Sequence, residues 1–205
     1  MTQTSVPDVV IRRLTTYLQT LKHMAQRGEH VASSTEIGRW AGVSPAQVRK
    51  DLSHFGEFGR QGLGYEIGFL CTQIERILKI DQDWRLILVG AGALGHALMN
   101  YGAFVTGRFQ IVAVFDSDPA KVNTRVGQRE ILPMERLAEI IAERHVEIAI
   151  LAVPATAAQH VADQLVACGV RSILSYAPIT LNTPRDVHVR YIDPVASLQT
   201  MTYYL

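Results

Sequence analysis

A glycine turn between two apolar segments constrains the fold of this chain more than any other feature. The apolar run 86–89 leads into Gly90-Ala91-Gly92-Ala93-Leu94-Gly95, which has the spacing G-x-G-x-x-G, and a helical stretch follows. A second apolar run, 111–115, ends at Asp116, twenty-one residues after Gly95. A strand, a glycine turn, a helix and a second strand that ends in an acid make up the first βαβ unit of a Rossmann-type parallel sheet.

Each part of this unit predicts a contact with a dinucleotide. Gly90 allows a tight turn, Gly92 lets the backbone approach a pyrophosphate, and Gly95 lets the helix pack close to the sheet. The helix N-terminus offers free N–H groups to the phosphates. Asp116 can accept hydrogen bonds from the adenosine ribose and repel a 2′-phosphate, which favours NADH or NAD+ over their phosphorylated forms. The alternative is a glycine-rich turn without a ligand.

Length, composition and cysteine spacing limit the class of protein. About eighty residues precede the first strand of the unit, enough for a small domain, and the 205 residues are 48% hydrophobic, as in globular proteins. No apolar run reaches membrane-spanning length, and the N-terminus lacks the features of a signal peptide. Cys71 and Cys168 lie far apart without metal-binding spacing. We therefore expect reduced thiols, no metal site, no membrane segment and a cytoplasmic location.

The first eighty residues begin with the pattern of a helix-turn-helix. Apolar residues at helical spacing predict a helix from Pro7 to about Gln26. Ser33 and Glu36 form a capping box that opens a second helix, which stops at Gly42. The residues of that helix expected to face inward are Ile37, Trp40 and Ala41.

A third helix follows, with one apolar and one polar face. Ser44 is its cap, Pro45 occupies its first position, and Gln47 is expected to complete a second capping box. The core positions are Val48, Leu52 and Phe55, and the outward positions are Ala46, Gln47, Arg49, Lys50 and Ser53. Basic and amide side chains on a recognition helix suit the major groove of DNA. We predict DNA contacts for Ser33, Ser44, Gln47, Arg49, Lys50 and Ser53; a helical hairpin with a merely solvated face is the alternative.

A glycine-rich segment, 56–65, carries four glycines and Arg60. It predicts a short β-hairpin wing whose arginine reaches the minor groove of DNA, with a plain surface loop as the alternative.

The distribution of charge also favours the first half of the chain as a DNA-binding region. Residues 1–80 carry ten basic and seven acidic side chains, a net charge of +3, whereas the remainder carries ten basic and twelve acidic side chains, a net charge of −2. This asymmetry is too modest to establish a nucleic-acid partner by itself.

Domain boundaries follow from these patterns. Helical spacing resumes after Tyr65, and the polar residues 81–83 mark the end of the first domain. We predict an α/β protein with a winged helix-turn-helix DNA-binding domain at 1–80, a Rossmann NAD(H)-binding domain at 84–192 and a C-terminal dimerisation segment at 193–205. Strands at 148–153, 172–176 and 187–192 and a helix at 155–167 would complete the parallel sheet.

Together these motifs resemble the Rex family of bacterial redox-sensing transcriptional repressors. The recognition helix reads Gln-Val-Arg-Lys-Asp-Leu-Ser-His-Phe-Gly at 47–56, and a glycine-rich wing and the turn at 89–95 follow. The resemblance spans nearly the whole chain. It includes Ser33-Ser34, the segment 115–119, Val153-Pro154 and Tyr176-Ala177-Pro178. The Arg-Lys-Asp-Leu run is specific only in combination with this Rossmann domain.

The resemblance implies a homodimer that binds an inverted-repeat DNA operator and loses affinity when NADH binds. It implies DNA contacts for Arg49, Lys50 and Arg60, pyrophosphate contacts for residues 90–95 and ribose contacts for Asp116. The residues expected near the nicotinamide and the dimer seam are Tyr101, Val153, Pro154, Tyr176, Ala177 and Pro178. NADH and NAD+ would act as ligands that are not turned over.

Two departures from the family pattern concern a possible switch. Many members carry an arginine where this chain has Gln19, although Asp193, its usual carboxylate partner, is present. Members also extend through a C-terminal helix, which we expect to be short here because the chain ends at Leu205. The apolar tail 201–205 is predicted to pack on the partner subunit, with packing on its own domain as the alternative.

Two rival functions share the glycine turn. A nicotinamide oxidoreductase needs a domain that holds the substrate, and only thirteen residues follow Ile192. His145 and His188 are expected to be solvated rather than catalytic, so we do not expect an enzyme. A CoA-binding protein of the succinyl-CoA synthetase type would have the same turn, but Asp116 favours a ribose.

Overall fold

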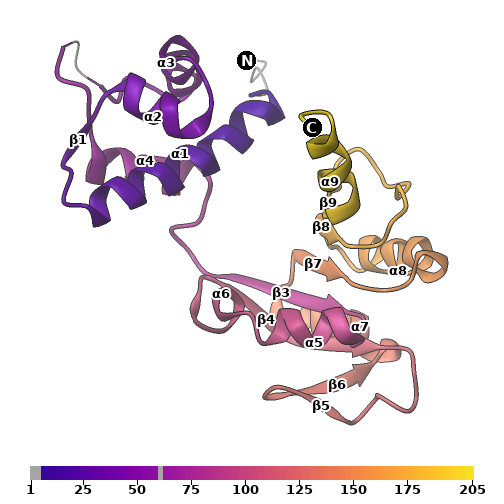
Figure 1. Cartoon of the computed structure of the whole chain (residues 1–205). Helices are drawn as coiled ribbons and strands as arrows, with labels where there is room; N and C mark the ends of the chain where they lie inside the picture. Colours follow the sequence, from indigo (N-terminus) through magenta and orange to yellow (C-terminus); the bar gives the residue numbers. More distant parts are fainter. Residues whose placement is uncertain (1–5, 60–61) are drawn as a thin grey trace. The chain divides into compact units, whose positions relative to one another are not determined.

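Contacts within the chain divide it into two units, one up to Gln82 and one from Asp83 (Figure 1). The computed structural model describes residues 6–59 and 62–205, so Arg60 lies outside the described residues. The first unit contains α1 (Asp8–Gln26), β1 (Val31–Ala32), α2 (Ser34–Ala41), α3 (Pro45–Ser53), β2 (Tyr65–Glu66) and α4 (Ile67–Ile77). The predicted succession of helices in this half is confirmed.

The amphipathic pattern of α1 gives the first unit its core. Leu14, Tyr17 and Leu21 lie one helical turn apart and are fully buried. They pack with Ile37 of α2 and Ile74 of α4 in a single apolar cluster. The cluster also takes in Val48 and Leu52 of α3, so the helix-turn-helix is built directly onto α1.

Trp40 departs from the predicted pattern. Its side chain is 55% exposed, and its ring meets that of His23 edge-on with centroids 5.4 Å apart. The inward face of α2 is instead formed by Ile37 and Gly38. A Cβ at Gly38 would come within 2.5 Å of the Val43 carbonyl oxygen, so this face packs too closely on the turn before α3 to accept a large ring.

The wing also differs from the predicted hairpin. In the described parts of 56–64 no strand forms, and the antiparallel pairing joins β1 to β2, with Val31 opposite Glu66 and Ala32 opposite Tyr65. Gly56 and Gly62 have φ values of 141° and 80°, which do not fit a ladder, and Gly64 forms only a single bridge next to β2. The glycine segment is therefore a loop closed by strands outside it.

The second unit contains the predicted parallel sheet and its helices (Figure 1). Its first part comprises β3 (Trp84–Val89), α5 (Ala93–Met99), α6 (Gly102–Thr106), β4 (Phe109–Asp116), β5 (Arg125–Val126), β6 (Arg129–Pro133), the 3-10 turn η1 (Met134–Arg136) and α7 (Leu137–Arg144). Its second part comprises β7 (Ile148–Leu151), α8 (Ala155–Ala167), β8 (Ser172–Ser175), β9 (His188–Tyr191) and α9 (Pro194–Thr202).

The strand order is β5-β6-β4-β3-β7-β8-β9, and only the β5–β6 pair is antiparallel. Without β5 this is the order of the doubly wound dinucleotide-binding fold, so the predicted fold class is confirmed. β3 lies between β4 and β7, where the winding direction reverses. In such sheets ligands bind outside the carboxyl ends of the strands at this reversal.

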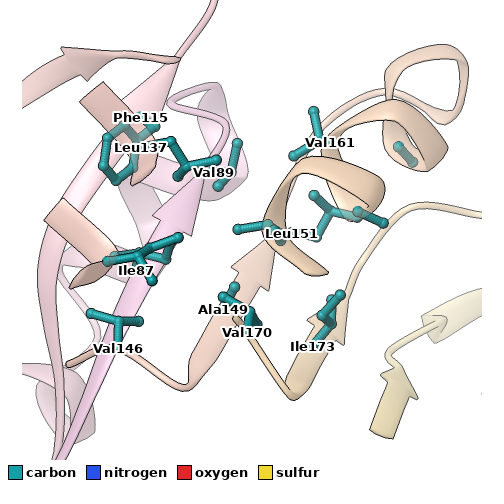
Figure 2. Packing of buried hydrophobic residues seen from close by; sticks show 14 of the residues in the cluster. Ile87, Val89, Phe115, Leu137, Val146, Ala149, Leu151, Val161, Val170 and Ile173 are labelled. Atoms are coloured by element: carbon teal, nitrogen blue, oxygen red, sulfur yellow. The ribbon is translucent and has the colours of Figure 1, made fainter. Parts of the chain in front are cut away.

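Alternating side chains of the central strands fill the two faces of the sheet. Ile87 and Val89 of β3 pack toward Leu137 of α7 and Val161 of α8 (Figure 2). Leu86 and Leu88, on the opposite face of β3, belong to a second cluster with Leu98 of α5. Burial on both faces explains why these strands read as continuous apolar runs.

The C-terminal helix α9 leaves its own apolar residues uncovered. Asp193 caps it by accepting hydrogen bonds from the backbone N–H groups of Val195 at 2.8 Å and Ala196 at 3.2 Å. No residue of α9 is buried, and Tyr204 beyond it is 81% exposed. The tail does not fold onto its own domain, so the alternative considered from the sequence is wrong. Within residues 6–59 and 62–205, no helix has the length and apolar character needed to cross a bilayer.

Candidate nucleotide and DNA sites

The three glycines of the turn differ in their surroundings. Gly90 has a φ of 105°, and a Cβ there would lie 2.3 Å from the carbonyl oxygen of Ala152. A Cβ on Gly95 would lie 2.1 Å from the carbonyl oxygen of Gly90, so α5 packs tightly on the turn. A Cβ on Gly92 would meet nothing within 4 Å. The backbone at Gly92 is thus open to an approaching group, which is the geometry that a pyrophosphate needs.

Asp116 ends β4 and reaches back to the glycine turn. Its Oδ2 accepts a hydrogen bond from the backbone N–H of Ala91 at 2.8 Å, and its Oδ1 accepts one from the N–H of Asp118 at 2.9 Å. The Nζ of Lys121 also donates to Oδ2, at 3.2 Å. With only 8% of the residue exposed, Asp116 links the end of β4 to the residue that follows Gly90. The sequence analysis gave Lys121 no role at this site.

The surroundings keep Asp116 ionised. Burial acts to raise the pKa of its carboxyl group, but the hydrogen bonds from Asp118, Ala91 and Lys121 outweigh burial and hold the pKa below its ordinary value. Hydrogen bonding to Asp116 in turn raises the pKa of Lys121. At neutral pH the site therefore combines a carboxylate with an ammonium group.

The predicted cofactor residues that follow β7 and β8 lie at the same edge of the sheet. Val153 and Pro154 follow β7, and Val153 lies beside Gly90, since its Cγ1 would be 3.1 Å from a Cβ there. The Tyr176 N–H donates to the Leu151 carbonyl at 2.9 Å, which brings the Tyr176-Ala177-Pro178 turn to the end of β7. Ala93 and Leu94 begin α5. Tyr101 precedes α6 and is exposed, with its ring 5.8 Å from that of Phe104.

The outward face of α3 carries exposed polar side chains. Lys50 and Ser53 are exposed, and the Ser53 hydroxyl donates to the Lys50 carbonyl at 2.8 Å. Arg49 is also exposed, and its Nη1 donates to the Ser34 hydroxyl at 2.8 Å. A hollow of about 660 Å³ lies between Arg49 and Ser53, the start of α2 and the glycine-rich loop. Arg49 thus sits in a groove bordered by both helices of the helix-turn-helix.

Three of the predicted DNA residues have structural tasks. The Ser33 hydroxyl accepts from the Glu36 N–H at 3.2 Å and completes the predicted capping box. The Ser44 hydroxyl accepts from the Gln47 N–H at 3.1 Å. The second capping box is wrong, however, because the Gln47 side chain donates to Oδ1 of Asp51 at 2.7 Å rather than returning to the cap. An acid one turn further along α3 offers it a stronger, charged acceptor.

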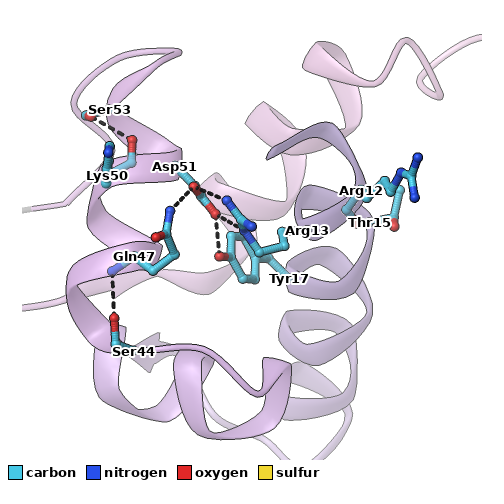
Figure 3. A network of polar contacts seen from close by, with 9 residues as sticks. All are labelled: Arg12, Arg13, Thr15, Tyr17, Ser44, Gln47, Lys50, Asp51 and Ser53. Carbon is cyan, nitrogen blue, oxygen red and sulfur yellow. Dashed lines mark hydrogen bonds and ion pairs between the residues drawn. The ribbon is translucent and has the colours of Figure 1, made fainter. Parts of the chain in front are cut away.

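Asp51 is the centre of a polar network that the sequence analysis missed (Figure 3). It is fully buried and accepts hydrogen bonds from Arg13, Tyr17 and Gln47. Its position carried a signal, because it lies three residues after Val48 and directly before Leu52, on the apolar stripe of α3. An acid on such a stripe requires a buried partner.

The network also changes the titration of its members. Burial acts to raise the Asp51 pKa, but hydrogen bonds from Arg13, Tyr17 and Gln47 outweigh it and lower the pKa below its ordinary value. Burial and the bond to Asp51 raise the pKa of Tyr17. Asp51 is therefore ionised at neutral pH, on the buried face of the recognition helix α3. The described part of the chain holds no cluster of His, Cys, Asp or Glu side chains arranged for a metal ion.

A helix-turn-helix with a basic outer face and a Rossmann-type unit with an open glycine turn together define a class: DNA-binding regulators that carry a nucleotide-binding domain. Family models follow the same division. A model described as "Putative DNA-binding protein N-terminus" matches residues 5–53, and one described as "CoA binding domain" matches residues 81–179.

Similar proteins identify the family within this class. The redox-sensing transcriptional repressor Rex of Chloroflexus aggregans is 54% identical over 97% of this chain and 94% of its own length. That of Desulforamulus reducens is 44% identical over 98% and 95%. The chain therefore belongs to the Rex family of redox-sensing transcriptional repressors, as its motifs predicted.

Solved structures of similar proteins match the fold over nearly the whole chain. A crystal structure of RSP in complex with β-NAD+ and operator DNA has a TM-score of 0.91 and 35% identity, and the match covers 98% of this chain and 93% of that chain. A crystal structure of RSP in complex with β-NADH has a TM-score of 0.89 and 33% identity, with 98% and 95% covered.

Proposed function

We propose that this protein is a DNA-binding repressor that senses the NADH/NAD+ ratio. NADH bound to the Rossmann-type unit releases a homodimer from an inverted-repeat operator, and neither nucleotide is turned over. Family membership and the RSP complexes with β-NADH and with β-NAD+ and operator DNA support this assignment. The role implies a cytoplasmic location.

The contact between Asp116 and the glycine turn is the observation that carries the nucleotide half of the proposal. One carboxylate oxygen holds Ala91 between the packed Gly90 and the open Gly92, so the acid proposed to bind the ribose is joined directly to the backbone proposed to bind the pyrophosphate. Gly90 to Gly95 bind the pyrophosphate, and Asp116 binds the adenosine ribose. The nicotinamide end lies toward Val153, Pro154 and the Tyr176-Ala177-Pro178 turn, with Tyr101 as a further contact.

DNA binding rests on the outward face of α3. Arg49, Lys50 and Ser53 contact the major groove, because they are exposed on the second helix of a helix-turn-helix. Ser33 and Ser44 lie at helix N-termini, where backbone N–H groups also suit phosphates. Gln47 contributes chiefly through Asp51. Arg60 keeps its predicted minor-groove contact as part of this proposal.

The homodimer is proposed from the exposed apolar surface of the C-terminal segment. Val195, Leu198 and Met201 lie at helical spacing on α9 and are each at least 60% exposed. A continuous apolar face of this kind favours burial against another protein surface, and a dimer satisfies the two-fold symmetry of an inverted repeat. Residues 193–205 are therefore assigned to dimerisation.

A binding assay tests the nucleotide half directly. We expect titration with NADH and NAD+ to give saturable binding at one site per chain, with NADPH weaker than NADH. CoA is the discriminating probe, since the model that matches residues 81–179 is described as a CoA-binding domain. CoA binding that excludes NADH would replace the present proposal with a CoA sensor. NADH binding that CoA does not displace supports it.

A further inference from the structure

We propose that Lys121 determines how strictly the nucleotide site rejects a 2′-phosphate. The inference rests on the proposed binding of NADH at Asp116. Discrimination against NADPH is assigned to the negative charge of that carboxylate, and Lys121 partly neutralises it. Lys121 would thus oppose the effect of Asp116 on this discrimination, although the two residues lie only five positions apart in the chain.

The position of Lys121 is set by the turn that follows β4. Its backbone N–H donates to the Asp118 carbonyl at 2.9 Å, and its Nζ lies 3.2 Å from Oδ2 of Asp116 and 3.6 Å from Oδ2 of Asp118. The Lys121 side chain is 39% exposed, against 10% for that of Asp116. Lys121 is therefore the more solvent-accessible partner of this ion pair, and a ligand that binds Asp116 also meets its ammonium group.

The limited number of acceptor positions on Asp116 means that a ribose bound there also meets Lys121. A carboxylate has about four acceptor positions. Ala91, Asp118 and Lys121 occupy three of them in Asp116, and two of these donors are backbone groups held by the turn. A ribose hydroxyl that binds Asp116 must use the remaining position or displace the lysine. In the first case the ammonium group keeps its contact with Asp116 beside the bound hydroxyl, and in the second its ion pair with Asp118 still holds it close to the ribose.

Charge then decides the sign of the effect. Asp116, Asp118 and Lys121 together carry a net −1, and without the lysine they would carry −2. A 2′-phosphate adds about −1.5 to −2. The raised pKa of Lys121, due first to its hydrogen bond with Asp116, keeps it protonated at neutral pH. The ammonium group both lowers the repulsion and offers donors to a phosphate, whereas a ribose hydroxyl gains little from it.

Binding of four nucleotides to matched variants tests the inference. NADH, NADPH, ADP-ribose and its 2′-phosphate are titrated by calorimetry, so that the second pair excludes effects of the nicotinamide. Lys121→Met is expected to raise the ratio of the NADPH to the NADH dissociation constant by about fivefold or more, as expected for loss of a partly exposed charge contact. Lys121→Arg keeps the charge and should stay near the wild-type ratio. Asp116→Asn should lower the ratio.

Lys22→Met is the matched control, because Lys22 also pairs with an acid, Glu75, at 2.6 Å but belongs to the first unit. In Lys22→Met, the ratio of the NADPH to the NADH dissociation constant should equal that of the wild type. An unchanged or lowered ratio in Lys121→Met, with thermal unfolding like the wild type, would overturn the role of Lys121 while NADH binding stands. Lys121→Gln repeats the comparison if the methionine variant is unstable. If the wild-type protein binds none of the four nucleotides, the proposed function is overturned as well.

Discussion

Arg13 of α1 holds Asp51 of the recognition helix α3 by two hydrogen bonds, from Nε to Oδ2 at 2.5 Å and from Nη2 to Oδ1 at 2.8 Å (Figure 3). Asp51 is fully buried, whereas the Arg13 side chain keeps 21% of its surface exposed. The pair ties the last turn of α3 to the first helix. It therefore fixes which face of α3 is turned outward and presents Arg49 and Lys50.

Arg13→Met is expected to lower the free energy of unfolding of the first unit by about 2–4 kcal/mol, because Asp51 is left buried without its charged partner. Arg12→Met is the control: Arg12 is the neighbouring residue, and its ion pair with Asp8 is exposed, so its loss should cost less than about 0.5 kcal/mol. Urea unfolding of both variants in a Trp84→Phe background, followed by the fluorescence of the remaining Trp40, measures both losses in the first unit. Equal losses in the two variants would contradict a special role for the buried pair.

The same pair should make stability depend on pH. The folded pKa of Asp51 lies below its ordinary value of 3.8, so its contribution to stability is present above that value and is lost as the pH falls through the folded pKa. The difference in unfolding free energy between wild type and Arg13→Met should therefore be constant from about pH 7 to 5 and shrink below about pH 4. The other carboxylates titrate in both proteins, so their contributions to this difference cancel. A difference of full size in strong acid would rule out Asp51 as its source.

Arg49→Ala and Lys50→Ala should each weaken operator binding by about 1–3 kcal/mol if their side chains read base edges, and NADH binding should not change. Arg39→Ala removes the same charge from an exposed position near the end of α2 and is the control for net charge. Fluorescence anisotropy of a labelled duplex at several salt concentrations separates the two effects. Near-normal affinity in both α3 variants would mean that another surface contacts DNA.

Removal of residues 199–205 should convert a dimer to a monomer, because it deletes the last turn of α9 together with the exposed Tyr203, Tyr204 and Leu205. Light scattering gives the mass directly. Leu198→Ser is a milder variant that keeps the chain length and should weaken the dimer without removing the helix. A truncated protein that stays dimeric and still releases DNA with NADH would exclude the tail as the coupling element.

Short-range patterns predicted most of the fold. The spacing of buried residues in α1, the capping box at Ser33 and the apolar runs of β3 and β4 all depend on neighbours within a few residues. Such features can be read from sequence because helices and strands bury fixed periodic positions. The glycine spacing likewise identified a turn whose three positions differ in φ and in free space.

Contacts over longer separations were harder to predict. Asp51 and Arg13 are thirty-eight residues apart, and nothing local indicates that this arginine, rather than Arg12, is the partner. Trp40 suits a core by residue type, but the close approach at Gly38 leaves no room for it. The wing strands pair across more than thirty residues, so the glycine loop alone gave the wrong partners. These details depend on tertiary packing, which single-sequence patterns do not contain.

The most direct test of the account is the affinity of one protein preparation for an inverted-repeat duplex, measured with and without saturating NADH. The duplex is first selected from a randomised pool with the cofactor-free protein, so that no operator needs to be assumed. We predict that NADH weakens binding by about 5- to 150-fold, and that the duplex weakens NADH binding by the same factor, because linkage is reciprocal. Equal duplex affinities with and without NADH, in a protein that binds both, would contradict the account.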